Sequence, residues 1–325
     1  MTDLFKPSST GPDQAEHMIT TLAKYCYAPF MLIGLNGAAI VLAATGAPEL
    51  LLLLVVLVAI VVSFTVERLI PYDNDWNYSH DDSLRDAVHV FVNETMILLS
   101  VAIIPVLALL RGGHTWWPTG WPFWVQVVIS ILVADVGITL VHMTSHRFGW
   151  MWRLHAVHHS VTRCYGLNGL MKHPLHQTLE MLGGVAPLIV IGIPVPVATA
   201  LAVCVAVQLL MQHSNADYRV GPFGRVLALN AGHRFHHLKY AGAGDVNFGL
   251  FTLIWDHLAG TYSYDPTRRF TSDDLGMAAE PDYPTRYTQQ LTAPFTAAGS
   301  CGPMQPLART TWRDRRRGVH TGHQP

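Results

Sequence analysis

Long apolar blocks alternate with short polar segments along this chain. Residues 25–48 and 50–66 carry no charged side chain, and a tight turn around Gly46 and Pro48 separates them. Two further apolar stretches cover residues 90–110, with Glu94 near the start, and residues 121–142. A helix needs about 20 apolar residues to cross a bilayer. The pattern therefore predicts an all-α, polytopic membrane protein with about four transmembrane helices, of which the first two form a hairpin.

A fifth apolar stretch, residues 181–211, is broken by the Gly192-Ile193-Pro194-Val195-Pro196 segment. Its two arms of about 10 and 16 residues give helices of about 15 and 24 Å, less than the hydrocarbon thickness of about 30 Å. We therefore expect a short re-entrant hairpin here. With an even number of crossings, the histidine-rich segments before and after it lie on the same side of the membrane.

The basic residues indicate which side that is. Of the 21 Lys and Arg residues, all except Arg111 fall on the histidine-bearing side of this topology. Cytoplasmic segments are enriched in Lys and Arg, so both termini and the clustered histidines are expected to be cytoplasmic. Four tryptophans around the start of the fourth span are expected to form an aromatic belt at the membrane surface: Trp116, Trp117, Trp121 and Trp124.

We divide the chain into three parts. Residues 1–24 are polar, lack the apolar core of a cleavable signal peptide, and are expected to form a cytoplasmic N-terminal segment. Residues 25–264 form the membrane-embedded domain, with a cytoplasmic helical cap that carries the histidines. Residues 265–325 are rich in Pro, Thr and Ala, include four arginines between 313 and 317, and are expected to form a disordered cytoplasmic tail. The alternative for this tail is contact with anionic lipid or an acidic redox partner.

Composition excludes several classes of protein. Only 13% of the residues are charged and 50% are hydrophobic, whereas soluble domains carry about 25% charge. The formal net charge of −1 argues against a nucleic-acid partner. The four cysteines form no CxxC pair, so neither a disulfide framework nor a zinc finger is expected.

Histidine is the exception in this composition, with 18 copies that are strongly clustered. An HxxxH pair is followed by two HxxHH groups, which together comprise His142, His146, His155, His158, His159, His233, His236 and His237. On a helix with 3.6 residues per turn, these spacings place the imidazoles of each group within one fan of about 100°. Eight histidines are too many for one metal ion and suit two. Imidazole suits iron, zinc, copper or nickel, so the ligand type does not name the metal.

Other residues are candidates to complete such a site. His213, at the end of the fifth apolar stretch, is a candidate ninth ligand. Asp135, two helical turns before His142, and Asp256 are candidates to hydrogen-bond a ligand imidazole. His173, with its neighbour His176, either supports the ligands or shapes the loop. A metal transporter is the alternative from another class, but it needs ligands near the middle of the membrane, and the first two spans are almost wholly apolar.

These motifs resemble the fatty acid hydroxylase superfamily, which comprises membrane-bound sterol desaturases and lipid hydroxylases. The resemblance covers residues 135–264 and rests on the three histidine boxes and on the closing segment 247–262, which contains Asn247-Phe-Gly and Ile254-Trp-Asp-His-Leu-Ala-Gly-Thr-Tyr262. This chain departs from the family pattern at Met143 and His257, where arginine is usual.

The resemblance implies a centre of two iron ions, replaceable by zinc in a purified sample, that activates dioxygen and oxidises a C–H bond of a membrane lipid. All eight box histidines are then catalytic metal ligands. The expected substrate is a sterol, as for the C-5 sterol desaturases, and the alternative is a fatty-acyl or other lipid. The chain shows no nicotinamide, haem or iron–sulfur motif. An external electron donor of the cytochrome or ferredoxin type, fed by NAD(P)H, is therefore expected.

Overall fold

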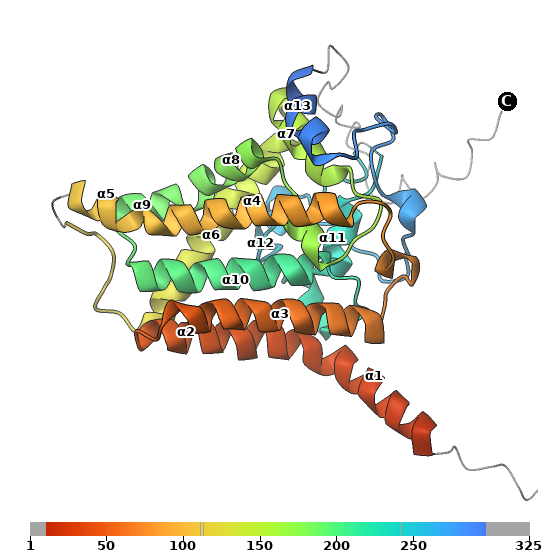
Figure 1. Ribbon diagram of the computed structural model, residues 1–325, viewed down its shortest axis with the longest axis horizontal. Helices are drawn as coiled ribbons and strands as arrows, with labels where there is room; N and C mark the ends of the chain where they lie inside the picture. Colours follow the sequence, from red (N-terminus) through yellow and green to blue (C-terminus); the bar gives the residue numbers. More distant parts are fainter. Residues whose placement is uncertain (1–10, 111, 113, 241, 297–325) are drawn as a thin grey trace, which may run out of the picture.

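The computed structural model describes residues 11–110, 112, 114–240 and 242–296, and all regular structure in these residues is helical (Figure 1). Short helical turns join some of the helices: η1 (Phe30–Leu35), η2 (Asp75–Asn77), η3 (Gly166–Leu170), η4 (Gly221–Arg225) and η5 (Ser272–Asp274). The α-helices are α1 (Gly11–Pro29), α2 (Asn36–Ala44), α3 (Glu49–Leu69), α4 (Ser83–Ala102), α5 (Ile104–Leu110), α6 (Phe123–Ser145), α7 (Gly149–His159), α8 (Pro174–Gly184), α9 (Ala186–Ile191), α10 (Val195–His213), α11 (Asn230–His236), α12 (Ile254–Ala259) and α13 (Tyr287–Thr296). The predicted all-α class is confirmed.

Among the described residues, five helical segments are long and apolar enough to cross a membrane. They cover residues 14–44, 49–69, 83–110, 123–145 and 195–213. The first four correspond to the predicted spans, and the chain is an integral, multi-pass membrane protein. Helix α1 begins at Gly11, so the first helical segment also includes much of the N-terminal part that we expected to precede the membrane.

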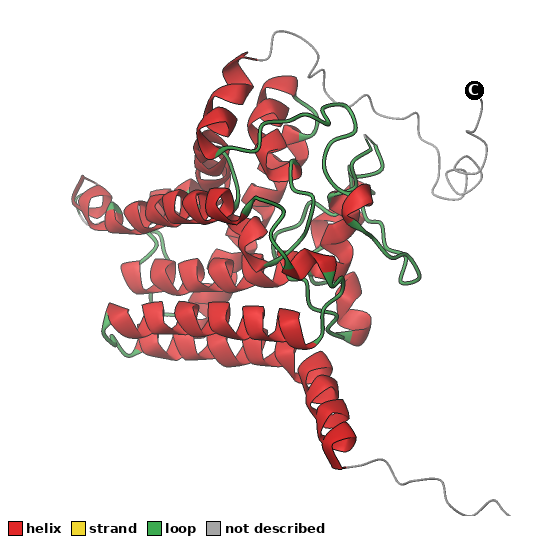
Figure 2. Cartoon of the chain, turned by 45° about the vertical axis from the view of Figure 1, so that its right-hand side comes forward, coloured by secondary structure: helices red, strands yellow, loops and turns green. Residues whose placement is uncertain are grey.

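The predicted reversal of the chain in residues 181–211 is present, but one of its arms is long enough to cross a membrane, whereas a short re-entrant hairpin was expected. Helices α8 and α9 form one arm and α10 the other, and Gly192 turns the chain between them in a left-handed conformation at φ 92° that favours glycine. Helix α10 has 19 residues, more than the 16 expected. It is also the central helix, because it packs against α2, α3 and α6 and is the most buried of the five candidate spans (Figures 1 and 2).

The chain reversals are divided between the two ends of this bundle. Helices α3, α6 and α10 end, and α4 begins, at the end where the short histidine-bearing helices α7 and α11 lie (Figure 1). The α2–α3 turn and the turn at Gly192 lie at the opposite end. This arrangement brings the three histidine boxes to one end of the bundle, as the even number of crossings requires.

Close contact between α6 and α8 fixes the position of α8. A Cβ atom added to Gly137 would lie 2.1 Å from the backbone oxygen of Gly183, and one added to Gly184 would lie 2.6 Å from the side chain of Ile138. Small residues let membrane helices approach at this distance. The contact places the polar residues of α8 beside the end of α6 that carries His142.

Two expectations need correction. Trp116, Trp121 and Trp124 are exposed, as an aromatic belt requires, but Trp117 is buried and its Nε1–H donates to Gln126. The predicted disordered tail is folded in its first part, because α13 packs against α7 and α4. The Gln290 Oε1 atom in this helix lies 2.9 Å from the His89 Nε2 atom. The four arginines of the tail lie outside the described residues.

We expect Gly137→Ala to destabilise the protein by about 1–3 kcal/mol, because the added methyl group meets the backbone of α8. Thermal unfolding in detergent measures the effect. Gly37→Ala is the matched control, since a Cβ at this helical glycine of α2 meets nothing within 4 Å. Equal melting temperatures for the two variants would contradict the packing described here.

Candidate metal centre

Nine buried histidines gather into two adjoining clusters at the end of the bundle. All eight box histidines are present, and His213 joins them. Within each cluster the candidate ligand atoms lie within 4.8 Å of one another. The first cluster contains His142, His146, His155, His159 and His236, and the second contains His158, His213, His233 and His237.

Helical spacing explains how each box is divided between the clusters. Residues four apart point in nearly the same direction, so His155 and His159 share the first cluster, while His233 and His237 share the second. The middle histidine of each HxxHH box lies on the other edge of the fan. His158 therefore reaches the second cluster and His236 the first. Each HxxHH box thus contributes to both clusters and ties them together.

The ring nitrogens within the clusters face one another. In the first cluster, the Nε2 atom of His142 lies 3.0 Å from that of His155 and 2.9 Å from that of His236. In the second, the Nε2 atom of His233 lies 2.9 Å from that of His213 and 3.1 Å from that of His237. Nitrogens bound to one metal ion at about 2.1 Å lie about 3.0 Å apart when the bonds are perpendicular, and about 3.4 Å apart in a tetrahedral site. The separations fit metal ions with ligands at right angles.

Hydrogen bonds at the opposite ring nitrogen orient several of these imidazoles. Backbone oxygens of Phe248, Met171 and Val246 accept from the Nδ1 atoms of His142, His158 and His236 at 2.8–3.0 Å. Each bond places the hydrogen on Nδ1 and leaves the Nε2 lone pair free for a metal.

The Asp245 carboxylate orients the His146 ring in the same way, with its Oδ1 atom 2.9 Å from His146 Nδ1. Burial lowers the pKa of His158 and His236 well below the usual value. These imidazoles are therefore neutral at pH 7, which is the form that binds metals.

The predicted carboxylates lie near the clusters but do not contact the imidazoles directly. Asp135 accepts hydrogen bonds from the Phe251 backbone N–H and from the side chains of Thr252 and Trp255. Asp256 accepts from the backbone N–H groups of Phe248 and Gly249. Both carboxylates therefore fix the segment that includes the Phe248 carbonyl, and they act on His142 only through it.

Of the other two candidate histidines, His173 shapes the chain, because its Nδ1 atom accepts the N–H of Leu175 at the start of α8. His176 contacts the centre, since the centroid of its fully buried ring lies 4.4 Å from that of His155. Its Nε2 atom lies 2.9 Å from Ser145 Oγ.

Sequence reasoning missed Asp245. No spacing pattern marks it, and only the fold of the segment after the third box brings it to His146.

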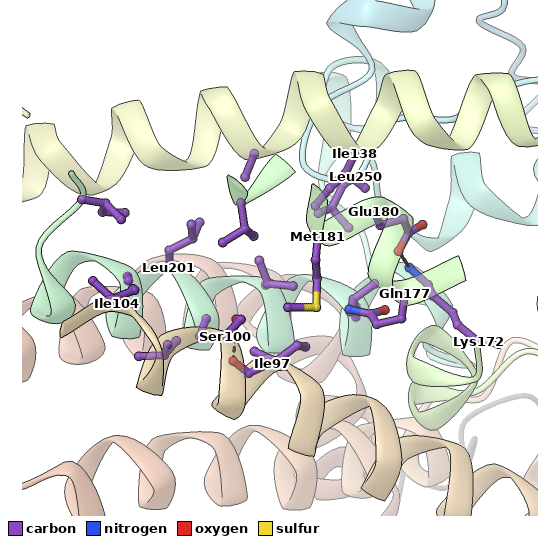
Figure 3. Close-up of a pocket in the computed structure, with 18 residues that line it drawn as sticks. Ile97, Ser100, Ile104, Ile138, Lys172, Gln177, Glu180, Met181, Leu201 and Leu250 are labelled. Atoms are coloured by element: carbon purple, nitrogen blue, oxygen red, sulfur yellow. Dashed lines mark hydrogen bonds and ion pairs between the residues drawn. The ribbon is translucent and has the colours of Figure 1, made fainter. Parts of the chain in front are cut away.

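An apolar cavity between α4, α6, α8 and α10 leads to the clusters (Figure 3). Five of its lining residues also line the smaller pocket that contains the histidines: Ile138, Lys172, Glu180, Leu209 and Leu250. A hydrocarbon chain in this cavity would therefore end beside the candidate metal centre.

Residues 127–261 match the family model for fatty acid hydroxylases. The chain is 31% identical over 252 residues to the ornithine lipid hydroxylase OlsE of Rhizobium tropici, with 74% of each chain covered. The chain belongs to the fatty acid hydroxylase family. No solved structure matches it.

Alkylglycerol monooxygenases are more distant relatives of this chain. The Danio rerio protein is 28% identical over 147 residues and the Homo sapiens protein 25% over 146, and each match covers 45% of this chain and 32% of the relative. The chain is thus a membrane lipid hydroxylase, an oxidoreductase with two buried histidine clusters able to bind metals. These relatives favour the alternative of a lipid hydroxylase over the expected sterol desaturase.

The two departures from the family pattern leave the clusters intact. Met143 is buried within α6, and the ring of His257 stacks on Tyr262 with its Nε2 atom 2.9 Å from the Arg225 backbone oxygen.

We expect Asp245→Ala to weaken metal binding by about 10–100-fold, because His146 loses the partner that orients its ring. Metal titration of the purified protein measures this. Asp273→Ala, at an exposed position in η5, is the control. If both variants bind metal as tightly as the original protein, Asp245 has no part in holding the centre.

Proposed function

We propose that the two histidine clusters hold two iron ions and that the enzyme hydroxylates a lipid with a long acyl or alkyl chain. In this proposal the eight box histidines and His213 are the metal ligands. The observation that carries it is the pair of adjoining clusters, with converging nitrogens, at the end of an apolar cavity. Nitrogen separations of 2.9–3.1 Å support ligands at right angles. The first cluster offers five nitrogens, one more than a tetrahedral zinc site takes, which favours iron, although zinc can occupy the site in a purified sample.

When bound, the iron ions supply dioxygen activation. The overall reaction converts a C–H bond, dioxygen, two electrons and two protons into a C–OH group and water. The protein's own residues bind and orient the components. Backbone oxygens and Asp245 hold the imidazoles in one tautomer, and the apolar cavity excludes water from the hydrocarbon.

Two electrons must come from outside the chain. The sequence carries no motif for a nicotinamide, haem or iron–sulfur group, so we assign this role to a cytochrome- or ferredoxin-type donor fed by NAD(P)H. Because 20 of the 21 Lys and Arg residues lie on the histidine-bearing side of the predicted topology, we place the centre and both termini in the cytoplasm. The donor then docks from the cytoplasm.

Hydroxylation is favoured over desaturation because the relatives are a hydroxylase and monooxygenases. OlsE acts on an ornithine lipid and the monooxygenases on alkylglycerols, as their names state. We therefore propose an amphipathic lipid with a chain and a polar headgroup as substrate, and no nucleic-acid partner. The transporter alternative is disfavoured, because the clusters lie at the ends of α6 and α10 rather than at their middle.

We expect His158→Ala and His236→Ala each to remove bound iron and to abolish the hydroxylated lipid, because each substitution removes one ligand from a different cluster. Iron analysis of the purified protein and mass spectrometry of lipids from expressing cells provide the two measurements.

His114→Ala is the matched control, since this histidine is exposed and outside both clusters. Wild-type iron content together with unchanged lipid products in the cluster variants would refute the proposal.

A further inference from the structure

The apolar cavity runs lengthwise from the histidine clusters into the bundle. Ala198, Leu201, Val205 and Leu209 line it from α10 over 11 residues, or about 16 Å of helix. Leu209 lies one turn before His213, whereas Ala198 lies about 22 Å before it along the helix axis. One end of the cavity therefore adjoins the metal centre, and the other lies deep among the spans.

Polar lining residues gather at the end beside the clusters. Lys172, Gln177 and Glu180 are grouped there in Figure 3. Ser100 lies farther along, but its hydroxyl donates to the backbone oxygen of Ile97 in the same helix. The remaining lining side chains are apolar. The cavity thus has a polar end and an apolar end, like one chain of an amphipathic lipid.

The polar end is built around a buried ion pair. Lys172 Nζ lies 2.5 Å from Glu180 Oε2, and their side chains are 9% and 5% exposed. The Lys172 backbone oxygen is held 3.0 Å from both His89 Nδ1 and Asn93 Nδ2, which fixes this residue in place. Both residues line the apolar cavity and the histidine pocket.

Burying an ion pair costs free energy of desolvation, and apolar residues of similar size are often as stable. Lys172 has three ammonium hydrogens and Glu180 accepts one of them. The pair therefore retains hydrogen-bond donors at the point where the cavity meets the clusters. An ester, amide or ether oxygen is an acceptor that these donors can bind.

We propose that the Lys172–Glu180 pair, with Gln177, binds the polar linkage of the lipid and thereby selects the carbon that is oxidised. The chain then extends along α10 away from the clusters, and oxygen is inserted at a carbon close to the polar linkage. The opposite orientation would bring the methyl end to the ion pair and bury the polar linkage among Ile104, Ile193 and Ala198, where it would lose its hydrogen bonds to water. This inference rests on the proposed function and adds the orientation of the substrate to it.

Product analysis tests the orientation. Cells that express the enzyme are fed palmitic acid deuterated only in the methyl-terminal half of the chain, and their lipids are analysed by tandem mass spectrometry. Hydroxylation replaces one hydrogen, so we expect a hydroxylated lipid that retains all the deuterium, with its oxygen in the fragment that contains the polar linkage. Loss of one deuterium, with oxygen in the terminal half, would overturn the inference but leave the proposed function intact. If no hydroxylated lipid is lost when His158 is replaced by Ala, both the inferred orientation and the proposed function are rejected.

Variants of Lys172 and Glu180 test whether this ion pair selects the carbon that is oxidised. We expect Lys172→Met with Glu180→Gln, which removes both charges together, to lower product formation at least tenfold and to spread the oxygen over several carbons at unchanged iron content. Lys172→Arg, which keeps the charge and the donors, should preserve the oxygen position. An unchanged rate and a single product position in the double variant would overturn the role of the pair.

A variant at the far end provides a test that leaves the ion pair untouched. Ala202→Phe fills part of the apolar end, so the profile of hydroxylated lipids should shift at least twofold toward shorter chains. Val61→Phe, on the exposed face of α3, should leave the profile unchanged. The same chain-length profile for Ala202→Phe and the unsubstituted enzyme would contradict a chain lying along α10.

Discussion

The structure depends on the burial of nine imidazoles in a space where their nitrogens face one another. The Nε2 atoms of neighbouring rings are 2.9–3.1 Å apart, and their lone pairs repel unless a proton or a cation lies between them. His142 and His236 both donate their Nδ1 hydrogen to a backbone oxygen, so a second hydrogen between their Nε2 atoms would give one ring a charge, which burial disfavours. A metal cation bound by neutral imidazoles resolves the conflict. The surrounding carbonyls and Asp245 fix the rings in the orientation that such a cation needs.

The bundle supplies the rigidity that this arrangement requires. Helix α10 brings His213 to the second cluster, and α6 ends with His142 and His146 at the first. The glycine contact between α6 and α8 holds the two helices at backbone distance, which sets the position of His176 and Glu180. Asp135 ties α6 to the segment after the third box through Phe251, Thr252 and Trp255. The site is therefore a junction of helices that are distant in sequence.

Its position at the end of the spans also places the metal centre next to the cavity that we propose for the lipid. The cavity between α4, α6, α8 and α10 offers an apolar environment along the length of a chain, while Lys172 and Glu180 introduce charge only where it adjoins the histidines. Hydrocarbon and polar linkage are thus recognised by different physical means, one by exclusion of water and the other by hydrogen bonds. The same division is found in the sequence, which places its candidate metal ligands at or beyond the ends of the apolar blocks.

The sequence alone determined the helical class, the spans and the candidate ligands, because hydrophobic blocks and i, i+3, i+4 spacings are local properties. Helical periodicity predicted the fans, but it could not assign His158 and His236 to the opposite clusters, since that depends on how α7 and α11 face each other. Asp245 reaches the site through a loop and His176 through the packing of α8 against α6, and neither contact leaves a periodic signal in the sequence. The Pro- and Thr-rich composition of the tail suggested disorder. Residues up to Thr296 are nevertheless folded, because α13 packs against α7 and α4. Tertiary structure decided these points, because each one is a contact between segments that approach only when the bundle has formed.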